Sequence, residues 1–132
     1  MYSITQAIRG PKIREKKSIF IATAIPVSGR EAVMTALDEL RQEFSKATHN
    51  AYAYRICVNQ EIHADCHDDG EVPRTAGEPI LNILGHYEII NILMVVTRFY
   101  GRIHLGPAGL IRQYSGAAKD LLDHIELITM NC

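Results

Sequence analysis

The chain has 132 residues with an apolar fraction of 47%, which suits one globular domain that can bury a substantial core. Its formal net charge of −1 excludes a protein that coats nucleic acid by bulk positive charge. Any contact with nucleic acid must therefore come from a local patch of cationic side chains.

The first third of the chain predicts two strands followed by a helix. Residues 2–9 alternate weakly and are expected to form an edge strand, which a charged turn over 12–17 separates from a second strand at 18–27. Ser28 is followed three residues later by Glu31, the spacing of a capping box, so a helix is expected to begin there. The apolar positions of this helix recur every three or four residues and would form one buried face: Val33, Ala36, Leu37, Leu40 and Phe44.

The middle of the chain predicts strands, a loop and a second helix. Residues 50–58 alternate with period two and indicate a strand, and 61–66 indicate a shorter one. The next stretch, H-D-D-G-E-V-P-R-T-A-G-E-P, is rich in Asp, Gly and Pro and is expected to be an ordered loop. Thr75 is predicted to cap a helix that runs to about Tyr87, with Gly85 as an alternative end.

The last third contains the most apolar segment. The continuous β-branched run from Ile89 to Val96 is typical of a strand buried on both faces. A glycine-rich loop follows, then a helical period from Gly106 to about Ile125, and residues 126–132 can add an edge strand. The order of elements predicts an α+β fold, a mixed sheet of about four to five strands with helices packed on one face.

The junction between this strand and the last helix, residues 98–112, combines glycines with side chains that can carry positive charge. A helix N-terminus presents free N–H groups and a partial positive charge, and glycine permits close backbone approach. We therefore predict an anion-binding surface, with a phosphate of RNA as the anion and an aromatic ring for base stacking: Arg98, Tyr100, Gly101, Arg102, His104, Gly106, Gly109 and Arg112. The alternative left open is that the glycines serve tight turns and the arginines are solvated.

The junction matches neither of two known phosphate motifs. Pro107 stands where the P-loop pattern needs its lysine, which excludes nucleotide hydrolysis of that type. Gly101 and Gly106 are too far apart for the dinucleotide pattern. No cofactor is therefore expected.

A cluster of His63, Cys66 and His67 resembles a metal or thiol site only superficially. A structural zinc site needs a second ligand pair, which the chain does not offer at a suitable spacing. A thiol nucleophile would need a base held by a third group, and none is evident. We expect no metal, and we interpret Cys57 and Cys66 as small buried residues.

Three carboxylates lie within four positions: Asp68, Asp69 and Glu71. Such acids can hold Mg²⁺ or form an acid and base pair. We favour a structural role, in which they cap a turn or helix or pair with Arg74, so no catalytic residue is assigned. Tyr52 and Tyr54 are interpreted as core residues in preference to base-stacking ones.

The cysteines and the N-terminus bear on location. Three cysteines, Cys57, Cys66 and Cys132, are an odd number without framework spacing, which favours a reducing compartment. The N-terminus lacks the pattern of a signal peptide, and the longest apolar run is too short to span a bilayer as a helix. We expect a soluble, cytoplasmic protein with no membrane partner.

Four stretches resemble the signature blocks of the IMPACT/YigZ family, in the family's order and over nearly the whole chain: K-K-S-I-F-I-A, A-T-H-N-A-Y-A-Y-R-I, D-D-G-E-V-P-R-T-A-G-E-P-I-L and V-V-T-R-F-Y-G-R-I-H-L-G-P-A-G-L-I-R-Q-Y-S-G-A-A. The resemblance implies a fold like the second domain of ribosomal protein S-five. Arg102 and Ala108 depart from it, because they stand where the family has glycines, and Arg102 adds positive charge. Residues 1–132 are expected to be a single IMPACT N-terminal-like domain, without the ferredoxin-like C-terminal domain of YigZ-like members.

The resemblance also implies a role in translation, by binding and not by catalysis. We expect a translation-associated regulatory module that binds RNA or a ribosome-associated partner through residues 98–112. Two alternatives stay open, a protein–protein regulator that does not touch RNA and an unrecognised hydrolase using Asp68, Asp69 and His49. The family surface implied beyond the junction consists of His49, Tyr54, Asp68, Asp69, Gly70, Thr75 and Gly77.

Overall fold

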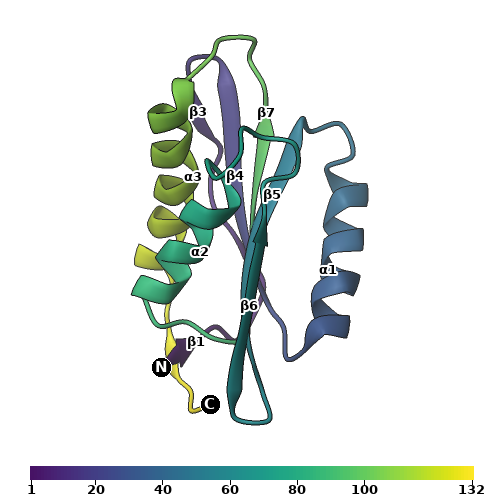
Figure 1. Cartoon of the computed structure of the whole chain (residues 1–132), viewed down its shortest axis with the longest axis vertical. Helices are drawn as coiled ribbons and strands as arrows, with labels where there is room; N and C mark the ends of the chain where they lie inside the picture. The colour runs from purple at the N-terminus through teal and green to yellow at the C-terminus, as the bar shows by residue number, and fades with distance from the viewer.

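The computed structural model describes residues 1–132 and contains three helices and eight strands (Figure 1). The helices are α1 (Arg30–Glu43), α2 (Gly77–His86) and α3 (Gly106–Asp123). The strands are β1 (Tyr2–Ser3), β2 (Ile8–Arg9), β3 (Ile13–Glu15), β4 (Ser18–Pro26), β5 (His49–Val58), β6 (Glu61–His67), β7 (Ile92–Phe99) and β8 (Ile128–Thr129). The α+β class is confirmed.

The main sheet has β7 at its centre. Its strands follow the order β2-β4-β7-β5-β6, β3 also pairs with β4, and every ladder is antiparallel. The sheet therefore has six strands and is not mixed; the one parallel contact is an isolated bridge between Tyr2 and Ile89. Residues 2–9 form two short strands instead of one, because β1 pairs with β8 while β2 pairs with β4.

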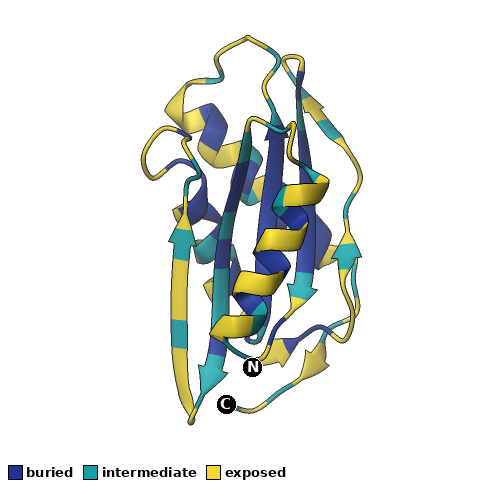
Figure 2. Ribbon diagram, turned by 90° about the vertical axis from the view of Figure 1, so that its right-hand side faces the viewer, coloured by how far each residue is buried: buried dark blue, intermediate teal, exposed yellow.

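Helices cover both faces of the sheet, so the prediction of helices on one face is wrong in this detail. On β7, Met94 and Val96 face α2 and α3, whereas Leu93 and Val95 face α1. Figure 2 shows the buried side of α1 turned toward the sheet and its exposed side turned outward. A strand that is apolar at every position needs cover on both faces, and α1 supplies the second one.

The helix starts differ from the predicted caps. α1 begins at Arg30, and its N-cap residue Gly29 has no side chain with which to form a capping box. α2 begins at Gly77, two residues after Thr75. The hydroxyl of Thr75 instead donates to the carbonyl of Val72, 2.6 Å away.

Asp68 supplies the cap of α2 from nine residues away. Its Oδ1 accepts the amides of Gly77 at 2.9 Å and Ala76 at 3.2 Å, and its Oδ2 accepts the amide of Arg74 at 2.9 Å. The amides of Ala76 and Gly77 belong to the helix start and have no intrahelical partners, and the amide of Arg74 belongs to the loop that leads into it. The structural interpretation of this acid as a cap is thereby confirmed.

We expect Asp68→Ala to lower the free energy of unfolding by about 0.5–2 kcal/mol, the range for a lost N-cap, because three amides lose their acceptor. Urea unfolding monitored by circular dichroism measures the change. Asp38→Ala is the matched control, since Asp38 is exposed on α1. Equal losses in the two variants would contradict the capping role.

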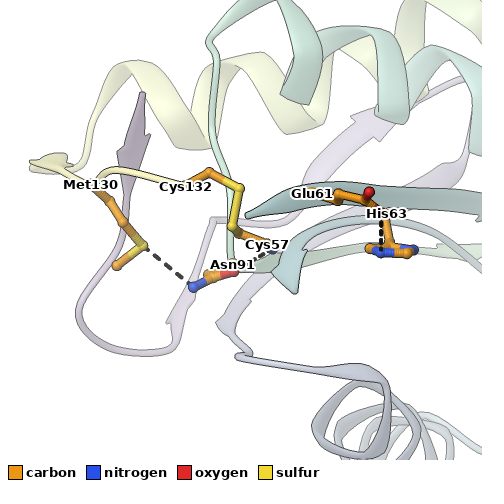
Figure 3. Close-up of a disulfide and its surroundings, with 6 residues drawn as sticks. All are labelled: Cys57, Glu61, His63, Asn91, Met130 and Cys132. Carbon is orange, nitrogen blue, oxygen red and sulfur yellow. Dashed lines mark hydrogen bonds and ion pairs between the residues drawn. A yellow bond between two sulfur atoms is a disulfide. The ribbon is translucent and has the colours of Figure 1, made fainter. Parts of the chain in front are cut away.

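The two ends of the chain meet at one end of the sheet, opposite the β7–α3 junction (Figure 1). The amide of Met130 donates to the carbonyl of Met1 at 3.0 Å. Cys57, near the end of β5, forms a disulfide with Cys132 (Figure 3). Beside it, the side chain of Asn91 accepts the amide of Cys57 at 2.9 Å and contacts the sulfur of Met130. The interpretation of Cys57 as a small buried apolar residue is therefore wrong, and the absence of framework spacing did not indicate unpaired cysteines in a reducing compartment, because a pairing across 75 residues leaves no local spacing to detect.

No helix in the structure combines the length and the apolar character needed to cross a membrane.

Candidate functional site

Three segments meet at the far end of the sheet, two of them neighbours in the sequence and the third distant from both (Figure 1). They are the C-terminal end of β7, the start of α3, and the loop that joins β6 to α2. The antiparallel register sets His49 of β5 directly beside Arg98 of β7. Arg98 follows Met94 and Val96 on the same face of β7, so a charged side chain ends an apolar row that faces α3.

Glu71 and Arg98 form a buried ion pair. Nη1 of Arg98 lies 2.8 Å and 3.1 Å from the two carboxylate oxygens of Glu71, and the two side chains are only 5% and 4% exposed. The hydroxyl of Tyr114 on α3 donates to the same carboxylate. Nη2 of Arg98 donates to Oγ of Ser18 at 3.2 Å. A buried pair with its remaining hydrogen-bonding groups satisfied is the arrangement in which attraction offsets desolvation.

Arg98 is therefore not the solvent-facing cation that the sequence analysis expects. Its charge is neutralised inside the protein by Glu71, so Arg98 is not carried into the anion site. Glu71 and Tyr114 were not predicted as members of this network. The available signal was Arg98 itself, because an arginine at the end of a buried strand needs an internal carboxylate.

Tyr114 is a permanent donor in the network. Burial, together with the hydrogen bond to Glu71, raises the pKa of Tyr114 far above its usual value. The phenol thus keeps its proton over the whole range in which proteins are folded. Tyr114 also packs edge-on against Phe20 of β4, with ring centroids 5.3 Å apart, which fixes α3 against the sheet.

His49 connects the network to the surface. Its Nδ1 lies 2.8 Å from the carbonyl oxygen of Asp69 and donates to it, which fixes the ring. Its Nε2 lies 3.5 Å from Oε1 of Glu71. Gly70, with φ of +84°, lies against this ring and takes a backbone conformation that suits glycine.

Above the ion pair lies an open pocket with a volume of about 420 Å³. Apolar side chains of Val72, Leu105, Pro107 and Leu110 line part of it. The remaining wall is polar or aromatic and consists of His49, Gly70, Glu71, Arg98, Tyr100, His104 and Gly106. The structure thus brings four of the predicted junction residues into one pocket: Arg98, Tyr100, His104 and Gly106.

Tyr100 and His104 stand at the exposed side of the pocket. The Tyr100 ring lies over the Arg98 guanidinium at 5.0 Å, and its centroid is 5.9 Å from that of His104. Arg102, between them in the chain, is exposed and has φ of +67°. Arg112 is exposed on α3, with its guanidinium directed back toward Gly109. Neither Arg102 nor Arg112 lines the pocket, although both belong to the segment 98–112, other residues of which form one side of it.

The start of α3 is open to an anion. Leu105 is its N-cap and offers no side-chain hydrogen bond, Pro107 follows, and the first turn has no acidic residue. Gly106, with φ of +74°, has open space where a side chain would be. The first amides of the helix therefore keep their partial positive charge on the pocket side.

Gly101 has a structural role. A side-chain carbon at this position would lie 2.2 Å from the backbone carbon and oxygen of Lys17. Its amide also donates to Oγ of Ser18 at 3.1 Å, so the junction packs directly on the β3–β4 turn. Gly101 is therefore required by close packing against the backbone of Lys17, which is neither the predicted approach of a ligand nor the tight turn of the alternative.

We expect Gly101→Ala to lower the free energy of unfolding by about 1–3 kcal/mol, because the rigid backbone of Lys17 must move. Gly116→Ala is the matched control, since no atom lies within 4 Å of its added carbon on the exposed side of α3. That control is expected to gain about 0.5–1 kcal/mol from helix propensity. Thermal unfolding of both variants tests this prediction: the melting temperature should fall for Gly101→Ala and rise for Gly116→Ala.

The carboxylates proposed for a hydrolase are committed to backbone amides. Both oxygens of Asp68 accept amides at the start of α2, and Oδ2 of Asp69 accepts the amide of Asn50 at 2.7 Å. His49 pairs with Glu71 and with the carbonyl of Asp69, not with either Asp carboxylate. The hydrolase alternative is therefore wrong in its choice of acids.

The other residues of the implied family surface lie apart from the pocket or are buried. Tyr54 is half-buried on β5 and packs with the α1 side of the core. Thr75 and Gly77 are buried at the start of α2, where a side-chain carbon at Gly77 would lie 2.7 Å from the amide nitrogen of His67. Cys66 is a half-buried free thiol, and burial raises its pKa, so it is not poised as a nucleophile.

Together, the fold and the site define a small α+β domain with a closed internal ion pair beneath an open pocket. A family model described as the Impact N-terminal domain matches residues 16–122. The chain therefore belongs to the IMPACT family, and the resemblance found in its sequence is confirmed.

Relatives in this family include bacterial and vertebrate proteins. The chain is 36% identical over 113 residues to the IMPACT family member YvyE of Bacillus subtilis, covering 86% of this chain and 52% of that protein. It is 39% identical over 117 residues to Protein IMPACT of Mus musculus, covering 86% of this chain and 36% of that protein. The chain thus spans about half the length of the bacterial relative and less of the vertebrate one.

Two solved structures are similar to this fold. A crystal structure described as a hypothetical protein matches with a TM-score of 0.91 and 28% identity, over 98% of this chain and 63% of that one. The structure of the two-domain translational regulator Yih1 matches with a TM-score of 0.61 and 27% identity, over 91% of this chain and 47% of that one.

Proposed function

We propose that this chain is a translation-regulatory module that binds a ribosome-associated protein, without catalysis, through the surface around the pocket. The regulatory role is supported by membership of the IMPACT family and by the similarity to a translational regulator. The observation that carries the binding mode is the pocket itself, which stays open while its charged floor is neutralised internally. We further propose that residues 1–132 act as one domain and, because the similar solved structure is a translational regulator, that they do so in the cytoplasm, although a disulfide such as Cys57–Cys132 is rare in that compartment.

Binding is favoured over catalysis because the polar groups of the pocket already bond to one another. Arg98 and Tyr114 occupy the carboxylate of Glu71, and Tyr114 keeps its proton. A catalytic group must exchange protons or bonds with a substrate, and these groups are held in a fixed arrangement. The network instead provides a rigid floor for a recognition surface.

A protein partner is favoured over RNA by the chemistry of the exposed groups. Val72 is 48% exposed, Tyr100 is 36% exposed and Ile103 is 39% exposed. Apolar and aromatic groups around a pocket are typical of the centre of a protein interface. RNA bound by phosphate contacts would instead need several free cations, and Arg98 is not one of them.

Direct RNA binding is the second candidate. It is supported by the exposed Arg102 and Arg112 beside the open start of α3. This surface offers few phosphate contacts, so any RNA affinity is expected to be weak and strongly reduced by salt.

Ribosome sedimentation separates the two candidates. The chain is mixed with ribosomes that carry their associated proteins, with salt-washed ribosomes, and with salt-washed ribosomes plus the wash fraction after nuclease treatment. We expect the chain to sediment with the first and third mixtures and not with the second, because the partner is a protein removed by salt. Equal sedimentation with salt-washed ribosomes would favour RNA, and none in any mixture would contradict ribosome association.

The double variant Arg102→Glu/Arg112→Glu tests the surface in the same assay. We expect it to sediment at least about tenfold less, because reversed charges at the rim oppose the partner. Arg30→Glu on α1 is the control for a charge reversal at an exposed arginine away from the pocket.

A further inference from the structure

Building on the proposed function, we propose that the partner presents an acidic peptide segment whose bulky apolar side chain enters the pocket. The inference specifies the chemistry of the recognised segment: one aromatic or large aliphatic anchor, flanked by Asp or Glu. It depends on three features: the apolar side chains that line the pocket, the buried Glu71–Arg98 pair whose hydrogen bonds are all made within the protein, and the positive charge of the exposed arginines nearby.

The apolar wall suits a single large side chain. Val72 comes from the β6–α2 loop and Leu105 from the start of α3, and the buried Leu110 also lines the pocket. A volume of about 420 Å³ is at the small end of the range for ligand pockets. Burial of one aromatic or leucine side chain would remove apolar surface on both partners from water, which is the main source of affinity at such anchors.

An apolar group can contact the floor of the pocket, formed by Glu71 and Arg98, without breaking any of their hydrogen bonds. Glu71 and Arg98 satisfy each other, and Tyr114 and Ser18 occupy their further hydrogen-bonding positions. An entering side chain therefore does not leave an unpaired charge in a dry environment, which would otherwise oppose binding. A ligand with a charged head at the bottom of the pocket would, in contrast, find no free partner there.

The free charge around the pocket is positive. Arg102 and Arg112 are exposed and make no ion pair. Of the nearest acids, Glu71 is neutralised by Arg98, whereas Asp68 and Asp69 keep their charge and accept backbone amides of the β6–α2 loop, the start of α2 and β5, outside the lining of the pocket. The open amides of α3 add to the same potential. Charge complementarity thus favours carboxylates beside the apolar anchor.

A peptide-display selection tests this inference. A library of short random peptides is selected on the full chain, and the enriched peptides are then measured by fluorescence polarisation against four variants. Val72→Arg obstructs the pocket while it keeps the positive surroundings, and Arg102→Glu/Arg112→Glu reverses the surroundings while it keeps the pocket. Ile62→Arg and Arg30→Glu are matched controls, because Ile62 is 41% exposed on β6 and Arg30 is exposed on α1.

We expect enriched peptides that carry one large apolar residue among Asp and Glu. Their affinity should fall by about tenfold or more in each pocket variant and by less than about twofold in each control. Enrichment of basic or uncharged peptides, no enrichment, or equal affinity for all variants would overturn the inference. If the chain still sediments with ribosomes in those cases, only the peptide chemistry is wrong; loss of sedimentation would instead contradict the proposed function.

Discussion

Arg98→Ala is expected to lower the free energy of unfolding by about 3–5 kcal/mol, because it leaves the buried carboxylate of Glu71 without its counter-charge. The same substitution at Arg102, which is exposed and unpaired, should change stability by less than about 0.5 kcal/mol. Urea unfolding at neutral pH measures both. An equally small effect at Arg98 would contradict the closed ion pair and restore this arginine as a candidate ligand for anions.

A double variant separates the ion pair from simple packing. Arg98→Met/Glu71→Gln removes both charges while it keeps much of the side-chain volume. Because removal of both partners avoids an unpaired buried charge, the double variant should be less destabilised than Arg98→Ala. A double variant that loses as much as the sum of the two single changes would show that the charges act independently.

Loss of the disulfide is the second large expected effect. Cross-linking residues separated by 75 positions restricts the unfolded chain, so Cys132→Ser should lower the free energy of unfolding by about 2–4 kcal/mol. The melting temperature should then fall on the order of 10 °C. Addition of dithiothreitol to the natural sequence should reproduce the shift.

Cys66→Ser is the control, since Cys66 is a free thiol in the same strand pair. It should melt close to the natural sequence and still respond to dithiothreitol. Identical melting with and without reductant would mean that Cys57 and Cys132 are not linked in solution.

The strongest periodicities predicted their elements well. The run from Ile89 to Val96 contains most of β7, and the helix predicted from Gly106 starts at that residue and ends at Asp123. The strand predicted at 50–58 is extended in the structure by only one residue. In each case, burial against neighbours and local pattern favour the same conformation.

The remaining features depend on contacts between distant residues, which local patterns do not contain. Thr75 was the predicted cap of α2, yet this helix is capped by Asp68, nine residues before its start. The position of α1 on the second face followed from the sheet order, not from its own periodicity. For Arg98, the residue type indicated a cation, while its position at the end of an apolar row determined that the charge is internal.

The sequence accordingly predicted which junction residues lie together, but not the chemical character of the surface that they form. Tyr100, His104 and Gly106 do lie together at the junction, because one short loop must return the chain from β7 to α3. The acidic loop that closes the pocket comes from between β6 and α2, and its Glu71 reaches the site through the fold alone. The surface therefore combines a neutralised floor with an apolar wall, where the sequence had indicated a row of free arginines.

Site-specific photo-crosslinking on ribosomes tests most directly whether this pocket is the partner-binding surface. The photoreactive residue p-benzoylphenylalanine replaces Tyr100 at the rim or, for comparison, Ile62 on β6, which has a similar exposure of 41% against 36%. We predict a discrete crosslink to a ribosome-associated protein from position 100, which excess unlabelled chain removes, and none from position 62. Crosslinks from position 62 alone, or equally from both positions, would contradict the account.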